Sequence, residues 1–83
     1  MASNLIETIK IDDRYGYTQT VVLGYNSTDS EQNVYVGKGY SASDATTSLG
    51  ICYRNGRYYK NSWSSERIEG KELTDKIINT LGL

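Results

Sequence analysis

The chain has 83 residues, a net charge of −1, eight tyrosines, one tryptophan, one cysteine, and no histidine, proline or phenylalanine. This length predicts a single small domain over residues 1–83, and the balanced charge gives no overall field that would attract nucleic acid. The lack of histidine excludes imidazole-dependent triads and zinc sites, and the single cysteine excludes an internal disulfide. We therefore expect a non-catalytic protein, not an enzyme, with no cofactor and no metal.

The N-terminal segment MASNLIETIK has neither a basic leader nor an apolar stretch of signal-peptide length. No other segment approaches the roughly 18 apolar residues that would span a membrane. These features predict a cytoplasmic protein without membrane association. In that compartment Cys52, which lies in an apolar run, is expected to be a buried structural thiol.

Alternating apolar and polar residues predict strands in the first half of the chain. Residues 7–11 are predicted as a strand, although residues 3–9 also fit a short amphipathic helix. Residues 17–25 show the clearest strand pattern of the chain. The polar segment 26–32 should join this strand to another over 33–40 as an antiparallel hairpin, with Val34 and Val36 facing the core.

The region from Ser41 to Lys60 has two interpretations. The spacing of Ala45, Leu49, Cys52 and Tyr53 favours a helix over 43–54 that ends at Asn55-Gly56, although glycine and threonines inside it are weak helix formers. Alternatively, residues 51–54 and 57–60 are the arms of a hairpin with a two-residue turn at Asn55-Gly56. The first interpretation is preferred, and in both of them residues 57–60 form a strand.

The C-terminal segment predicts an amphipathic helix over 71–81. Its apolar side chains recur at helical spacing at Leu73, Ile77, Ile78 and Leu81, and Gly82 follows its end. Together these elements predict an α+β fold: a three- to four-stranded, mainly antiparallel sheet with two helices packed on one face.

One cluster of side chains is the candidate binding site. Residues 53–63 combine cations and aromatic rings without any acidic residue, and the proposed contact residues are Arg54, Arg57, Tyr58, Tyr59, Lys60 and Trp63. Tyrosine, tryptophan and arginine dominate protein interfaces, and basic residues beside exposed rings can also bind phosphates and unpaired bases. A structural interpretation is equally open, in which the rings fill the core and the cations are solvated.

These interpretations predict a small regulator or inhibitor that acts by contact with a protein partner. The alternative is an RNA or single-stranded nucleic-acid-binding module that uses the same cluster. A homodimer is also possible, because an exposed edge strand could pair with a second copy.

The passage GKGYSASDA, from Gly37 to Ala45, resembles the strand-to-helix junction of double-stranded RNA-binding domains. Those domains have lysines at the start of the helix, where this chain has Ser43 and Asp44, and a negative charge there would repel a phosphate. The order of strands followed by a helix is also similar to that of HicB-like antitoxins. Both resemblances concern shape, and the chain is assigned to neither family.

Overall fold

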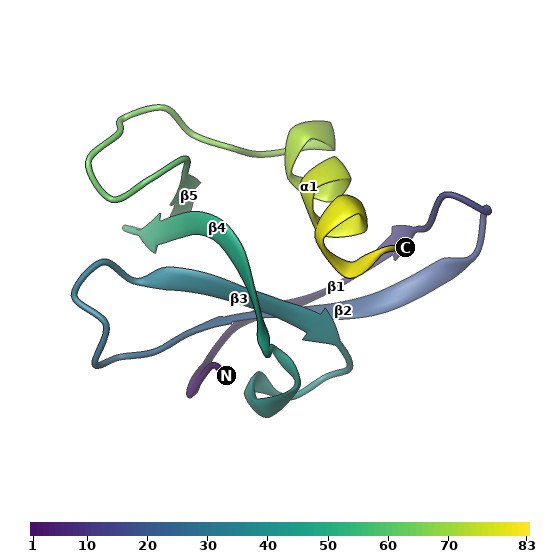
Figure 1. Cartoon of the computed structure of the whole chain (residues 1–83), viewed down its shortest axis with the longest axis horizontal. Helices are drawn as coiled ribbons and strands as arrows, with labels where there is room; N and C mark the ends of the chain where they lie inside the picture. Colours follow the sequence, from purple (N-terminus) through teal and green to yellow (C-terminus); the bar gives the residue numbers. More distant parts are fainter.

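A computed structural model describes all residues, 1–83, and shows one antiparallel sheet with a single α-helix (Figure 1). The five strands lie in the sheet in the order in which they occur in the chain. Their bounds are β1 Asn4–Asp12, β2 Thr18–Tyr25, β3 Asn33–Lys38, β4 Thr47–Arg54 and β5 Arg57–Tyr59. A short 3-10 turn, η1 (Ala42–Asp44), lies between β3 and β4, and α1 (Lys71–Leu81) follows β5. No helix of the structure has the length and apolar character needed to cross a membrane.

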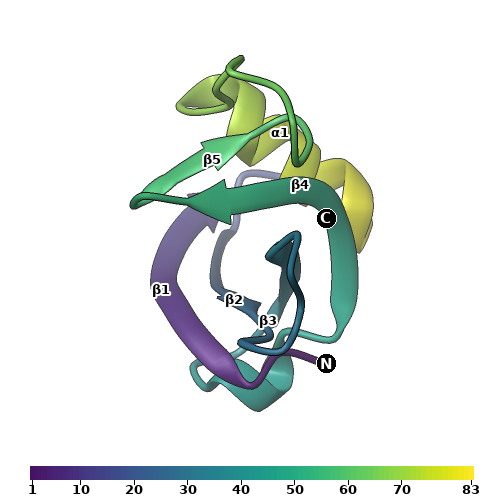
Figure 2. The ribbon, with the colours of Figure 1, turned by 90° about the vertical axis from the view of Figure 1, so that its left-hand side faces the viewer.

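The sheet curls into a half-barrel, and α1 lies across its open side (Figure 2). Alternate residues of the strands point into the concave side, where Leu23, Val36 and Ile51 are almost completely buried. Ile77 and Leu73 of α1 pack against them and complete the core. The curvature lets a short chain enclose its apolar side chains with one helix, because the sheet itself forms most of the wall.

The predicted fold class is wrong in both its strand number and its helix number. The sheet has five strands, not three or four, and the helix expected over 43–54 does not form. Residues 42–44 make a single 3-10 turn, and residues 47–54 form β4. The hairpin interpretation of the region around Asn55-Gly56 is the correct one, because Cys52 to Arg54 pair with Arg57 to Tyr59.

The helix prediction failed because the apolar residues between 45 and 53 do not lie on one face. Some belong to β4, and others belong to the segment that leads into it. Leu49 and Ile51 point into the concave core, whereas Ala45 packs with Ala2 and Val22 on the convex side. Their combined spacing imitates a helical period. Gly50 has a φ of 76°, a conformation that interrupts a regular helix and that glycine adopts readily.

The remaining elements agree with the sequence patterns. The strand predicted at 7–11 lies within β1, the segment 17–25 forms β2, and the hairpin loop over 26–32 leads into β3. The strand predicted at 57–60 is β5, and α1 begins and ends where its apolar spacing indicates. Asn55 and Gly56 have φ values of 52° and 75°, the pair of left-handed residues that a tight two-residue hairpin turn requires.

The two edges of the sheet differ in how they are covered. At β5, the amide of Ile68 donates to the carbonyl of Tyr58 and the amide of Lys60 donates to the carbonyl of Glu66, each at 3.0 Å. The segment before α1 therefore covers the outer side of β5. The opposite edge is β1, which pairs with β2 alone.

Three turns are each held by one aspartate: Asp13, Asp29 and Asp44. The Asp13 carboxylate accepts bonds from the side-chain amide of Gln19 at 2.8 Å and from the main-chain amides of Tyr17 and Tyr15 at 2.9 Å. These bonds hold the pKa of Asp13 below its usual value of 3.8, and the bond from Gln19 contributes more than those from the two main-chain amides. The ionised carboxylate is thus the form that stabilises the β1–β2 turn.

This aspartate turn predicts a specific loss of stability in acid. A lowered folded-state pKa stabilises the protein above the unfolded value near 3.8, and this stabilisation disappears as the pH falls through the folded value. Asp13→Ala should therefore unfold at lower urea concentration than the wild type at pH 7, and the difference should shrink towards zero at about pH 2. Glu31→Ala, which removes an exposed acid that accepts no hydrogen bond, is the control. An equal deficit of Asp13→Ala at both pH values would contradict the assignment.

Candidate functional site

The structure brings the predicted contact residues to one end of the molecule, on the β4–β5 hairpin and the loop that follows it. This loop, residues 60–65, is the green segment at the upper left of Figure 1. Its residues and those of the hairpin do not form one uniform basic and aromatic surface. They divide into core rings, ion-paired or hydrogen-bonded cations, and two side chains that are free to contact a partner.

Two tyrosines of the cluster belong to the core. Tyr58 is 9% exposed, and its ring lies 5.5 Å from that of Tyr53, which in turn lies 5.8 Å from that of Tyr25. The Tyr58 hydroxyl is buried without a hydrogen-bond partner. Burial raises its pKa above the usual range, and the negative charge of Glu7 on β1 adds to this effect. The structural interpretation therefore applies to Tyr58, which contributes packing and not a contact surface.

Arg54 holds the loop that follows β5. Its guanidinium donates to the carbonyls of Asn61 at 3.1 Å and Ser62 at 2.7 Å, and also to the carbonyl of Ser64. It also lies 4.0 Å above the centre of the Tyr59 ring. A planar group with several fixed donors can bind several carbonyls at once, which a lysine ammonium cannot do in the same geometry. All of these contacts are internal, so Arg54 is a positioning residue of the loop.

Asn61 fixes the same loop from within. Its side-chain carbonyl accepts bonds from the amides of Trp63 at 3.2 Å and Ser64 at 2.8 Å, and the Ser64 hydroxyl accepts one from the amide of Glu66 at 2.9 Å. The backbone on both sides of Trp63 is therefore tied down. Its indole ring is nevertheless 83% exposed, the largest exposed fraction among the large apolar side chains. The loop thus presents a tryptophan to solvent on a rigid support.

The other two cations differ in their partners. Lys60 lies 3.0 Å from the carboxylate of Glu66 and 3.7 Å from that of Glu72, and the hydrogen bond and charge of Glu66 raise the pKa of Lys60. Arg57 is exposed at the tip of the hairpin and makes no ion pair or side-chain hydrogen bond. Of the three cations in the predicted site, Arg57 is the one that is available to a phosphate or carboxylate.

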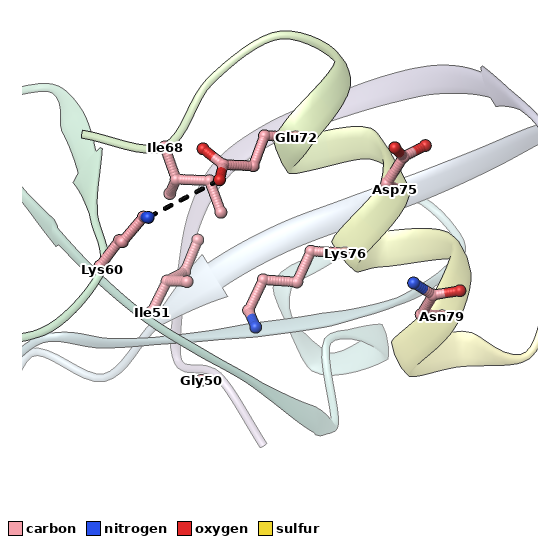
Figure 3. Close-up of a pocket in the computed structure, with 8 residues that line it drawn as sticks. All are labelled: Gly50, Ile51, Lys60, Ile68, Glu72, Asp75, Lys76 and Asn79. Atoms are coloured by element: carbon pink, nitrogen blue, oxygen red, sulfur yellow. Dashed lines mark ion pairs between the residues drawn. The ribbon is translucent and has the colours of Figure 1, made fainter. Parts of the chain in front are cut away.

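A groove lies between β4 and α1 (Figure 3). It has a volume of about 460 Å³ and opens widely to solvent. Lys60 and Glu72 form an ion pair at one end, and Lys76 reaches from α1 towards β4. Asp75 is paired with Lys71 at 2.7 Å. Both carboxylates that line the groove are thus neutralised by lysines, and no group of three or more potential ligands is placed to hold a metal ion.

The chain matches no protein-family model, no curated protein and no solved structure.

Sequence reasoning did not identify the residues that support Trp63. Asn61 could have been found, because asparagine often bonds to main-chain amides two and three residues further on and so nucleates a turn. The role of Arg54 carries no such local signal. Its partners lie seven to ten residues away along the chain, and they meet it only because the β4–β5 hairpin folds back.

The support from Arg54 can be tested by a conservative substitution. Arg54→Lys keeps the charge but cannot hold three carbonyls, so the variant should lose roughly 1–3 kcal/mol of unfolding free energy and free the loop. Trp63 is the single tryptophan, so its fluorescence anisotropy reports directly on loop motion and should decrease. The matched control is Arg57→Lys, which should change neither stability nor anisotropy. Equal behaviour of the two variants would show that the loop is held by other contacts.

Proposed function

We propose that this protein is a small non-catalytic binding module, a regulator or inhibitor that occupies the surface of a protein partner. The contact centre is Trp63, and Arg57, at the tip of the β4–β5 hairpin, adds a positive charge at the same end of the molecule. A cytoplasmic location belongs to the same proposal. The observation that carries it is the combination of an 83% exposed indole and a backbone fixed on both sides of it.

The physical argument concerns the cost of association. A large apolar ring exposed to water contributes nothing to the stability of the free domain, but its burial in a partner's pocket releases its hydration shell. Ordering a flexible loop on binding would oppose association, whereas a loop that is already held by Arg54 and Asn61 avoids most of that cost. Tryptophan and arginine are also the side chains found most often at the centres of tight interfaces.

The nucleic-acid alternative has weaker support. Trp63 could stack on an unpaired base and Arg57 could neutralise a phosphate. However, Arg54 donates to three main-chain carbonyls and Lys60 lies between two glutamates. One free cation in the predicted site, on a chain of net charge −1, gives little electrostatic attraction to a polyanion.

The test removes Trp63 and compares the loss of binding with that caused by removing another highly exposed ring elsewhere. Tyr15 is 75% exposed and belongs to the turn between β1 and β2, which lies at the other end of the molecule, on the right of Figure 1. A partner captured from source cells by the wild type should bind Trp63→Ala roughly 30-fold more weakly, because loss of a central anchor costs about 2 kcal/mol or more. Binding of Tyr15→Ala should be unchanged.

Arg57→Glu should weaken the same complex through reversed charge, with circular dichroism confirming that both variants are folded. Partner capture that does not change in either variant would place the interface elsewhere.

The nucleic-acid alternative is tested by titrating labelled single-stranded RNA and DNA while following the fluorescence of Trp63. Quenching that weakens steeply with salt would favour nucleic acid over a protein partner.

A further inference from the structure

The tip of the β4–β5 hairpin combines two residues that can react with each other. Asn55 is the only one of the six asparagines that is followed by a glycine. Asn55 and Gly56 are both exposed, and neither the Asn55 side chain nor the Gly56 amide makes a hydrogen bond. No atom beyond its chain neighbours lies within 4 Å of the position where a side chain of Gly56 would begin. Both reacting groups are therefore accessible to solvent and free of competing contacts.

The side chain of an asparagine can lose ammonia by reaction with the next main-chain nitrogen. The Gly56 amide gives its proton to water or to a base in the solvent, and its nitrogen attacks the side-chain carbonyl carbon of Asn55. A carbon–nitrogen bond forms, the side-chain amino group takes up a proton and leaves as ammonia, and a succinimide ring results. Water then opens this ring at one of its carbonyl carbons. The product at position 55 is aspartate or isoaspartate, and in isoaspartate the main chain runs through the former side-chain carbon.

We propose that Asn55 is a site of spontaneous deamidation in the folded protein, and that the isoaspartate product releases the loop that carries Trp63. Glycine favours the attack because it has no side chain to hinder the approach of its nitrogen. Ring closure also requires Asn55 to leave its left-handed conformation, which has a φ of 52°. Opening of the Arg54–Arg57 pair allows this rotation, and a hairpin tip opens more easily than a packed core.

The other asparagines in exposed or polar segments lack this combination. Asn61 precedes a serine, and its side-chain carbonyl accepts hydrogen bonds from two main-chain amides. Asn33 begins β3, and its side-chain amide donates to Asp29 at 2.8 Å. Asn26 follows β2 in a turn, but it is half-buried and precedes a serine, whose side chain hinders the attack. Deamidation is therefore expected at Asn55 first.

The isoaspartate product cannot keep the tip of the hairpin closed. A two-residue turn between antiparallel strands depends on the backbone conformation of its central residues, and isoaspartate adds a carbon to the main chain there. The pairing of Arg54 with Arg57 is then lost. Because Arg54 also donates to the carbonyls of Asn61 and Ser62, its displacement frees the loop and the backbone around Trp63.

Deamidation also adds a negative charge between two arginines. Arg57 is the free cation of the predicted site, and a carboxylate two residues away attracts it and reduces its availability to a partner. The effect on partner binding rests on the proposed function, whereas the modification and the release of the loop do not. A partner that contacts Trp63 and Arg57 should be captured less well by modified protein than by fresh protein.

Incubation of the folded chain at mildly alkaline pH, followed by mass spectrometry of its peptides, tests the reaction. Asn55 should be converted before any other asparagine, with the mass increase that accompanies exchange of an amide for a carboxylate. The fluorescence anisotropy of Trp63 should fall in step with the amount of isoaspartate.

Two variants are the controls for this incubation. Asn55→Gly adopts the left-handed conformation readily and has no side-chain amide to lose, so its mass and its anisotropy should stay constant. Freshly purified Asn55→Asp has the added charge without the additional main-chain carbon, and its anisotropy should equal that of the wild type. This pair separates the effect of the main chain from the effect of charge.

The chain unfolded in guanidinium chloride is the reference for an unrestrained asparagine–glycine pair. Loss of ammonia from the unfolded chain with Asn55 intact in the folded protein would show that the hairpin protects the site, and would overturn the proposal. Conversion of Asn55 in the folded protein without a change in anisotropy would overturn the release of the loop. Neither measurement involves a partner, so a failure of the proposed function at Trp63 would leave both results unaffected.

Discussion

The conformation of the loop that follows β5, residues 60–65, depends on the guanidinium of Arg54. It stands at the last position of β4, stacks on Tyr59 of the next strand, and donates to carbonyls at both sides of Trp63. These bonds close the loop against the hairpin and direct the chain towards the segment that covers the edge of β5. An arginine that donates three internal hydrogen bonds rigidifies its surroundings, and here this rigidity makes an exposed tryptophan compatible with a well-defined loop.

On the convex side of the sheet, small residues allow other segments of the chain to approach the strands closely. A side chain at Gly37 would collide with the main-chain carbonyl of Asp44, and one at Gly24 would meet Ala2 and the carbonyl of Asn4. The turn η1 and the N-terminal segment can therefore lie directly on the strands. This contact buries Val22 and Ala45, so a chain of 83 residues obtains a second, small cluster outside the concave core.

Local patterns predicted the elements whose residues in the main core keep a single period. Val21 and Leu23 alternate as a strand requires, and Leu73 and Ile77 repeat as a helix requires. The prediction failed between Ala45 and Tyr53 because these residues pack on both sides of a curved sheet, and a mixture of two faces resembles a helix. The candidate site was predicted as a set of cations and aromatic residues that lie close together in the sequence. Which of its cations are free depends on partners that only the fold brings close: carbonyls of the following loop for Arg54 and the carboxylates of Glu66 and Glu72 for Lys60. Composition cannot reveal these contacts.

The two edges of the sheet differ in whether their main-chain groups are accessible to another strand. The edge at β5 is closed by residues 66–68, which also carry the loop back from Trp63 to α1. The edge at β1 has a bulge near one end, a lysine near its middle and the C-terminus at the other end, features that shorten a strand edge and oppose open-ended aggregation. What remains is a segment with one lysine and one aspartate at alternating outward positions. Such an edge is too short to recruit strands without limit.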